Sequence, residues 1–287
     1  MKLNNIDFQF KSWFTGFFEG DGCFNINRKT NRCFLMINQK NPQVLIYIKN
    51  TLKRGSIKKY DNYYRWTVSS KKDMYDIIQI FNGYLILDKT NIKLQEWIQS
   101  YNTYYKLKKS DFYYITYKNK GSWNSHNSWQ SGFIDAEGCF NIRIVNKLAK
   151  QKELLSKVQK QPNIDLINKN LKSWKKYILS PELLSPISLR VRLRFVVRQK
   201  SEKKILDKLK ELYTGSVGNK QDIFTYTLDS NRRQLKIINY ILKHPLKSIK
   251  HKDFLKWKNM YNLLEKKDHL KIKNVTKVIN YLLKHNN

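Results

Sequence analysis

The chain has 287 residues, which is enough for two modest domains or for one duplicated unit. Its 56 Lys and Arg residues exceed 22 Asp and Glu, and the resulting net charge of +34 is spread along the whole chain, so that a polyanion such as nucleic acid is the expected partner. No stretch approaches the ~20 apolar residues of a membrane-spanning helix, and the 3 cysteines and 5 histidines lack the spacing of a disulfide framework or a zinc site. We therefore expect no membrane partner.

The first predicted element is a helix from Ser12 to about Asp21, with apolar residues at helical spacing and Gly22 as its stop. It belongs to the stretch WFTGFFEGDGCF, Trp13 to Phe24. The stretch WQSGFIDAEGCF, Trp129 to Phe140, repeats the order Trp, Gly, Phe, acid, acid, Gly, Cys, Phe. One structural unit has been used twice.

The same order of elements follows each motif. Two strands with alternating apolar residues come first (CFNINRK and FLMINQKN; CFNIRIV and SLRVRLRFVVRQ), followed by a helix, a hairpin that opens at Gly-Ser, and two further helices. The middle helix is predicted at Pro42 to Leu52 and at Ser201 to Leu212. The pattern predicts an α+β protein of two pseudo-symmetric αββαββαα repeats: residues 1–112, a linker at 113–128, and residues 129–287.

The second repeat carries an insertion at about 146–188, which interrupts its first hairpin. The insertion is either a tolerated surface elaboration or a source of further nucleic-acid contacts. The lysines that could make these contacts are Lys169, Lys172, Lys175 and Lys176.

Small residues recur at one helical face of each motif, Gly16 and Gly20 in the first and Gly132 and Ala136 in the second. Residues four apart share a helix face, and small residues there let two helix backbones approach closely. If the motif helices pack through these faces, their C-terminal ends bring Asp21 and Glu137 together. Glu19 and Asp135 point elsewhere, and we expect them to bond backbone or polar groups near the interface.

Two carboxylates that meet at the negative ends of two helix dipoles repel each other. A divalent cation relieves this repulsion, and oxygen ligands with open positions favour Mg²⁺. The alternative is a core helix with a polar C-terminus, which does not account for the acid that both copies keep at the same position.

The segments FTGFFEGDG (14 to 22) and QSGFIDAEG (130 to 138) resemble two copies of the LAGLIDADG motif. The order of elements around them resembles the single-chain, two-repeat homing endonucleases of organellar introns. This resemblance implies a monomer in which each repeat forms an antiparallel-sheet saddle, with the two repeats packed through the motif helices. It also implies an organellar gene, for which a mitochondrial location is favoured over a plastid one.

The resemblance further implies the residues of a catalytic site. Asp21 and Glu137 would bind the metal, Mg²⁺ or Mn²⁺, and two glutamines and two lysines would lie near it. By their place in the repeats these four are Gln39, Gln199, Lys89 and Lys250.

A polar and basic face of the predicted strands suits DNA recognition. A two-stranded ribbon fits the major groove, where Arg pairs with guanine and Asn with adenine, and a strand of about eight residues spans ~26 Å at ~3.3 Å per residue. In the first repeat this face carries Asn25, Asn27, Lys29, Arg32, Asn38, Lys58, Tyr60, Arg65 and Thr67; in the second it carries Asn141, Arg143, Arg190, Arg192, Arg194, Lys220, Thr225 and Thr227.

These features predict an endonuclease that cuts both strands of DNA at a long, imperfectly palindromic site. Two alternatives share the fold: an RNA maturase that aids the splicing of an intron, and a non-catalytic scaffold that binds nucleic acid. The acids present at both motif positions favour the nuclease.

Overall fold

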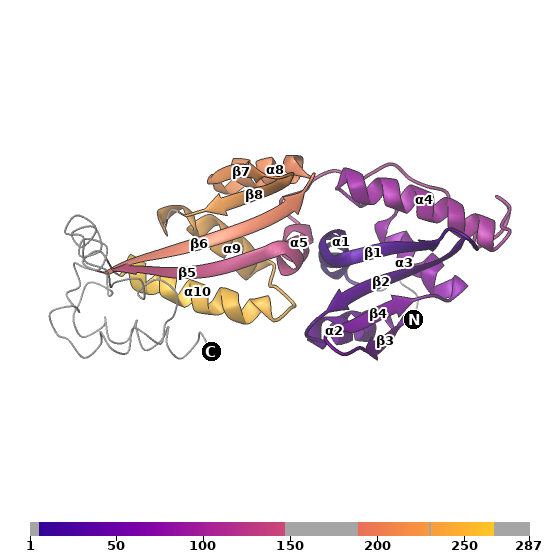
Figure 1. The fold of residues 1–287 in the computed structure, drawn as a ribbon, viewed down its shortest axis with the longest axis horizontal. Helices are drawn as coiled ribbons and strands as arrows, with labels where there is room; N and C mark the ends of the chain where they lie inside the picture. Colours follow the sequence, from indigo (N-terminus) through magenta and orange to yellow (C-terminus); the bar gives the residue numbers. More distant parts are fainter. Residues whose placement is uncertain (1–5, 147–188, 230, 267–287) are drawn as a thin grey trace, which may run out of the picture. The chain divides into compact units, whose positions relative to one another are not determined.

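The computed structural model describes residues 6–146, 189–229 and 231–266 (Figure 1). Apart from Asn146 at its start, the predicted insertion with its four lysines lies outside the described residues. No helix in the described part of the chain combines the length and the hydrophobicity needed to cross a bilayer.

The first repeat follows the predicted order of elements. It consists of α1 (Phe8–Asp21), β1 (Gly22–Asn27), β2 (Arg32–Gln39), α2 (Gln43–Leu52), β3 (Ser56–Lys59), β4 (Tyr64–Val68), α3 (Lys71–Phe81) and α4 (Asp88–Tyr104). The second repeat has the same order: α5 (Trp129–Glu137), β5 (Gly138–Asn146), β6 (Leu189–Lys200), α8 (Lys203–Tyr213), β7 (Ser216–Lys220), β8 (Ile223–Leu228), α9 (Leu235–Lys243) and α10 (Lys250–Glu265). The αββαββαα duplication is confirmed.

Helix α1 begins earlier than predicted. The Asp7 carboxylate accepts a hydrogen bond from the Phe10 backbone nitrogen at 3.0 Å and caps the helix, which begins at Phe8, four residues before Ser12. Its end agrees with the prediction, because a Cβ on Gly22 would lie 2.5 Å from the Phe18 carbonyl oxygen. Gly138 ends α5 for the same reason, because a Cβ on Gly138 would lie 2.6 Å from the carbonyl oxygen of Ile134.

Each repeat contributes a four-stranded antiparallel sheet to the described structure, in the orders β1-β2-β4-β3 and β5-β6-β8-β7. The two β3-β4 and β7-β8 hairpins open at glycines with positive φ, Gly55 at +75° and Gly215 at +92°. In both cases an added Cβ would approach a backbone oxygen of the facing strand, that of Thr67 or Thr227. The two hairpins are therefore built by the same steric device.

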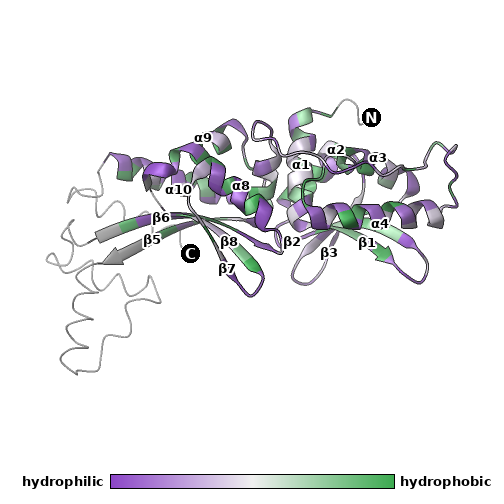
Figure 2. Cartoon of the chain, turned by 90° about the horizontal axis from the view of Figure 1, so that it is seen from above, coloured by the Kyte–Doolittle hydropathy of each residue, from purple (hydrophilic) through white to green (hydrophobic). Residues whose placement is uncertain are grey.

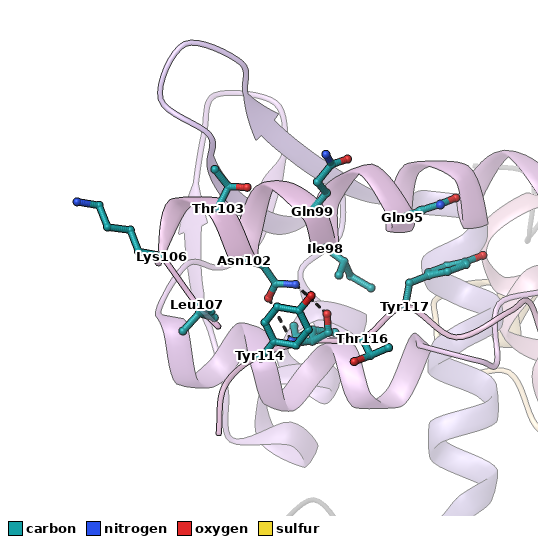
Figure 3. Close-up of a pocket in the computed structure, with 11 residues that line it drawn as sticks. Gln95, Ile98, Gln99, Asn102, Thr103, Lys106, Leu107, Tyr114, Thr116 and Tyr117 are labelled. Atoms are coloured by element: carbon teal, nitrogen blue, oxygen red, sulfur yellow. Dashed lines mark hydrogen bonds between the residues drawn. The ribbon is translucent and has the colours of Figure 1, made fainter. Parts of the chain in front are cut away.

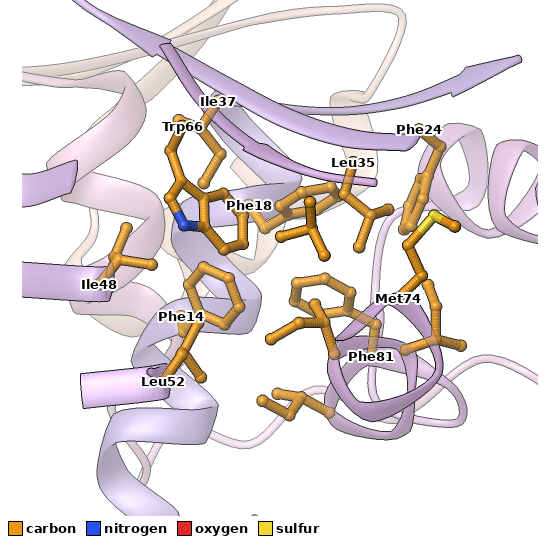
Figure 4. Packing of buried hydrophobic residues seen from close by; sticks show 14 of the residues in the cluster. Phe14, Phe18, Phe24, Leu35, Ile37, Ile48, Leu52, Trp66, Met74 and Phe81 are labelled. Carbon is orange, nitrogen blue, oxygen red and sulfur yellow. The ribbon is translucent and has the colours of Figure 1, made fainter. Parts of the chain in front are cut away.

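The core of the first repeat lies between its sheet and its helices. Figure 4 shows Phe14 and Phe18 of α1 with Phe81 of α3 beneath the strand residues Leu35 and Ile37. All five are fully buried. Figure 2 shows that the helices of this repeat carry hydrophobic and hydrophilic residues together, as expected for elements that bury one face and expose the other.

The described residues group into two compact units whose boundary differs from that of the repeats. One unit takes the chain up to Cys139 together with Val196–Thr227 and Leu235–Asp253. The other takes the remaining described residues. Both motif helices, and all six residues predicted for the catalytic site, belong to the first unit.

The segment predicted as a linker, 113–128, ends where α5 begins. Its backbone is hydrogen-bonded to side chains of the first repeat. The Asn102 side chain bonds both backbone groups of Ile115, at 3.1 Å and 2.8 Å, and the Lys118 backbone nitrogen donates to Asn82. A hollow of about 490 Å³ lies between α4 and this segment, and Figure 3 shows the residues that line it. It is lined by none of the residues predicted to act on nucleic acid.

Helices α1 and α5 pack against each other at backbone contact. A Cβ on Gly16 would lie 2.0 Å from the carbonyl oxygen of Trp129, and one on Gly132 would lie 1.8 Å from that of Trp13. A Cβ on Gly20 would lie 2.3 Å from the Cβ of Ala136. The small residues are thus the interface itself, as the sequence predicts.

Replacing Gly132 by alanine should destabilise the protein by about 3 kcal/mol or more, because the new methyl meets backbone rather than a side chain that can move. Gly218→Ala is the matched control: nothing lies within 4 Å of its Cβ position, so its effect should stay within about 0.5 kcal/mol of wild type. Denaturant unfolding of the three proteins tests this. If the two variants unfold at the same denaturant concentration, Gly132 does not lie in backbone contact with α1.

Candidate active site

Asp21 and Glu137 are the last residues of α1 and α5, and the packing of these helices brings the two side chains together. The position of a Gly20 Cβ lies 3.2 Å from Glu137 Cγ. Burial raises the pKa of Glu137, and the nearby charge of Asp21 raises it further. The pair therefore meets where two helix C-termini also disfavour negative charge.

A glutamine lies beside each of these acids. Gln39, the last residue of β2, donates from Nε2 to Asp21 Oδ2 at 2.6 Å, and this bond opposes the rise that burial causes in the pKa of Asp21. Gln199 near the end of β6 makes the corresponding bond to Glu137 and likewise lowers its pKa. The two predicted glutamines thus take equivalent places in the two repeats.

The two predicted lysines complete the cluster. Lys89 Nζ donates to Gln199 Oε1 at 2.7 Å, and Lys250 Nζ donates to the carbonyl oxygen of Ala136 at 2.5 Å. Burial lowers the pKa of both lysines, whereas surrounding acids, including Glu137, raise it. Six residues from both repeats therefore converge on one place.

The first acids of the motifs are buried and do not face this cluster. Glu19 Oε1 accepts from the backbone nitrogens of Ile86 at 2.8 Å and Leu87 at 2.7 Å, just before Lys89. Asp135 is used in the same way: it accepts from the backbone nitrogen of Lys247 at 2.7 Å.

Ser248 bonds Asp135 through its backbone nitrogen at 3.1 Å and its Oγ at 2.5 Å, two residues before Lys250. Both acids hold backbone groups near the helix interface, so the expectation for Glu19 and Asp135 agrees with the structure. Each acid also fixes the backbone just before one lysine of the cluster: Glu19 before Lys89, and Asp135 before Lys250.

Two tryptophans cross the helix interface to these buried acids. Trp13 Nε1 donates to Asp135 Oδ2 at 2.8 Å, and Trp129 Nε1 donates to Glu19 Oε2 at 2.6 Å. Burial raises the pKa of Glu19 to about 8, against the lowering effect of its hydrogen bonds. Sequence reasoning missed this role, although the tryptophan stands at the same position in both motifs.

Glu202 is a further buried acid that the sequence analysis did not single out. Its Oε1 accepts from the Lys89 backbone nitrogen at 2.9 Å, so that it holds the first turn of α4 from the other repeat. Pro42 occupies the corresponding position in the first repeat, and a comparison of the two repeats therefore hides Glu202.

The donor set at the foot of the helices fits a hard divalent cation. Asp21 and Glu137 supply oxygen. Burial and then the charge of Asp21 raise the pKa of Glu137, and a positive charge between the two side chains would oppose both effects. In the described part of the chain no three His, Cys, Asp or Glu side chains group into a metal site. Two carboxylates suit a hard divalent cation that keeps several of its waters.

None of the residues predicted to read DNA in the first repeat is buried. Lys29 and Arg32 are exposed at the β1-β2 turn. Asn38, Arg65 and Lys58 are cross-strand neighbours on β2, β4 and β3. This agrees with a polar outer face on the first sheet.

In the second repeat, Arg143, Arg192 and Lys220 are exposed, whereas Thr225 and Thr227 are half-buried. Arg194 pairs with Asp229, with 2.6 Å between Nε and Oδ1, so part of its charge is neutralised within the protein. Arg190 belongs to β6, but its side chain lies outside the described part, and Asn141 is exposed in β5.

The Trp129→Phe variant should be destabilised because it leaves the buried Glu19 carboxylate without its third donor. We expect an additional loss of about 1–3 kcal/mol relative to Trp257→Phe. Trp257 is a suitable control because it is fully buried, and its indole nitrogen has no hydrogen-bond partner in the described part of the chain. Thermal and denaturant unfolding measure the difference, and equal losses would mean that the Trp129 bond contributes nothing.

Comparison with known proteins shows which sequences and folds this chain resembles. A family model described as LAGLIDADG endonuclease matches residues 14–101 and 178–261. A Neurospora crassa protein named "Probable intron-encoded endonuclease 4" is 28% identical over 95% of this chain, which spans 43% of that protein's length. An "Uncharacterized cox1 intron-2 37.2 kDa protein" of Schizosaccharomyces pombe is 24% identical over 92% of this chain and 69% of its own.

The fold also matches a solved structure. The LAGLIDADG meganuclease I-AabMI, bound to uncleaved DNA, superposes with a TM-score of 0.64 at 21% identity, covering 94% of this chain and 97% of that one. Together, the duplicated motif helices, the acids at their ends and the family match over both repeats show that the chain belongs to the LAGLIDADG endonuclease family.

Proposed function

We propose that the chain is a site-specific, metal-dependent DNA endonuclease that acts as a monomer. The observation that carries this proposal is the convergence of Asp21 and Glu137, each with a glutamine, on two lysines that come from both repeats. A single chain supplies both halves of the site. The names of its relatives, and the DNA bound to the similar meganuclease, support the same reaction.

The residues of the cluster suit the hydrolysis of a phosphodiester. Mg²⁺ or Mn²⁺ held by Asp21 and Glu137 would activate water and stabilise the leaving oxygen. Gln39 donates a hydrogen bond from Nε2 to Asp21. Its Oε1 is left to accept a hydrogen bond from the attacking water and so to orient it. Gln199 Oε1 orients the ammonium group of Lys89.

Lys89 and Lys250 supply positive charge where negative charge develops on the phosphate. Their burial strengthens this effect because the surroundings screen the charge less than water does. The acids around them favour the charged form. Since each repeat brings an acid, a glutamine and a lysine, we assign one set of groups to each strand of a duplex.

We assign recognition of the DNA target to the two sheets. Residues 1–112 and 129–287 form the two repeats, joined by 113–128, and each sheet would follow the major groove over one half of an imperfectly palindromic site. We place the gene in an organelle, with a mitochondrion favoured over a plastid. The relative named for a cox1 intron supports an organellar origin.

Asp21→Asn and Glu137→Gln should each reduce DNA cleavage by about 100-fold or more, since the loss of even an outer partner of a metal ligand costs about 10- to 100-fold. Purified proteins are incubated with a randomised duplex library in Mg²⁺ or in EDTA, and the cut ends are sequenced. Glu96→Gln on the exposed face of α4 makes the same change of charge and should cut like wild type. Metal-independent cutting, or full activity of Asp21→Asn, would reject the assignment, and tight binding of intron RNA without DNA cleavage would identify a maturase.

DNA affinity should fall steeply with salt. A protein that makes six to ten phosphate contacts loses about 10³- to 10⁵-fold in affinity between 50 and 200 mM salt. A titration of labelled duplex at several salt concentrations, in EDTA to prevent cleavage, gives the slope. A flat dependence would argue against any nucleic-acid partner.

A further inference from the structure

The outer face of the first sheet carries a row of three polar side chains on neighbouring strands. Asn38 on β2 lies opposite Arg65 on β4, and Lys58 on β3 lies opposite Arg65 on its other side. Trp66 and Val68, which alternate with the outward residues of β4, are fully buried. Strand β4 is an interior strand of this sheet (Figure 1), so Arg65 lies at the centre of the polar face rather than at its edge.

The Arg65 guanidinium is held by its neighbours along one edge. Nε donates to Asn38 Oδ1 at 2.9 Å, and Nη2 donates to the Tyr63 hydroxyl at 3.0 Å. These two bonds fix both the direction and the plane of the group. A planar fork that is already ordered loses little side-chain entropy when it meets a ligand.

Two stacked tyrosine rings lie next to the guanidinium. The rings of Tyr60 and Tyr63 stack with centroids 4.8 Å apart and an interplanar angle of 8°. The Arg65 Cζ lies 4.9 Å from the Tyr60 centroid and 5.5 Å from that of Tyr63. Both distances are within the range of cation–π attraction.

The remaining hydrogen-bond capacity of Arg65 is at its other edge. A guanidinium has five N–H groups, of which Nε–H and one Nη2–H are engaged. The end of the fork, with one N–H on each of Nη1 and Nη2, matches a pair of acceptors in one plane. In the DNA major groove guanine offers such a pair, O6 and N7.

We propose that Arg65 reads one guanine in the major groove of the DNA target, with Asn38 and Tyr63 as positioning residues. This inference rests on the proposed function. It also changes the role expected for Asn38: its Oδ1 is engaged by Arg65, whereas direct recognition of adenine needs both Oδ1 and Nδ2.

The second repeat lacks this arrangement. Counting from the hairpin glycines Gly55 and Gly215, Arg65 corresponds to Thr225 and Lys58 to Gly218, while Tyr60 and Tyr63 correspond to Lys220 and Ile223. A threonine side chain cannot form the two-pronged contact. The guanine read by Arg65 therefore has no counterpart at the equivalent position of the other half-site.

The test is a binding selection from a randomised duplex library with the full chain in EDTA, compared between wild type and Arg65→Ala, Arg65→Lys and Tyr63→Phe. Wild type should require G·C at one position of one half-site. Arg65→Ala should reduce that preference by about 5- to 150-fold, the equivalent of 1–3 kcal/mol for a bidentate pair, and leave the other positions unchanged. Arg65→Lys keeps the charge but not the fork, so it should lose the preference while retaining the salt dependence.

Tyr63→Phe separates positioning from contact, since it removes only the hydroxyl group that bonds Nη2. It should weaken the same preference by a smaller factor and leave the rest of the site unaltered. Glu96→Gln, on the exposed face of α4, is the control outside the sheet and should not change the G·C requirement. Loss of that requirement in Glu96→Gln would overturn the assignment to Arg65.

Two results would overturn the inference while the proposed function stands. In one, wild type selects an extended site and Arg65→Ala keeps every preference. In the other, Arg65→Ala weakens binding to all sequences equally and lowers the salt slope by about 1, as the loss of a phosphate contact does. If wild type selects no DNA sequence at all, the proposed function and this inference fail together.

Discussion

The close contact between α1 and α5 is the constraint on which the rest of the first compact unit depends. Because Gly16 and Gly132 have no Cβ, each helix can bring a carbonyl oxygen against the backbone of the other. This approach has two consequences. It places the acids at the helix ends beside each other, and it lets each tryptophan reach the buried acid of the opposite motif.

The two acids of each motif have separate tasks that their environments decide. Glu19 and Asp135 accept hydrogen bonds from the interface tryptophans and from backbone groups, and so fix the segments before Lys89 and Lys250. Asp21 and Glu137 lie at the helix ends, where burial raises the pKa of both carboxyl groups and the charge of Asp21 raises that of Glu137 further, so that a cation between them would be favoured. Substitutions of the first acid should therefore affect folding before they affect chemistry.

Much of this organisation could be predicted from the sequence because duplication provides an internal comparison. Two copies of the motif show which glycines and acids are constrained, and the spacing of Gln39 and Gln199 gives their shared place. Where the two copies differ, this comparison does not identify functional residues. Glu202 has Pro42 as its counterpart, and the stacking of Tyr60 on Tyr63 next to Arg65 depends on a hairpin geometry that periodicity does not reveal. The start of α1 at Phe8 depends on a single side-chain cap.

The contrast between the interior and the outer face of the sheets follows from the same physics. At the helix interface a larger residue collides with the facing helix, and loss of a tryptophan leaves a buried carboxylate with one donor fewer, so both motifs keep small residues, acids and a tryptophan at equivalent positions. On the outer face a residue can change without either penalty, and Arg65 and Lys58 correspond to Thr225 and Gly218. A duplicated fold can in this way hold a nearly symmetric site for hydrolysis while its two sheets diverge to read different sequences.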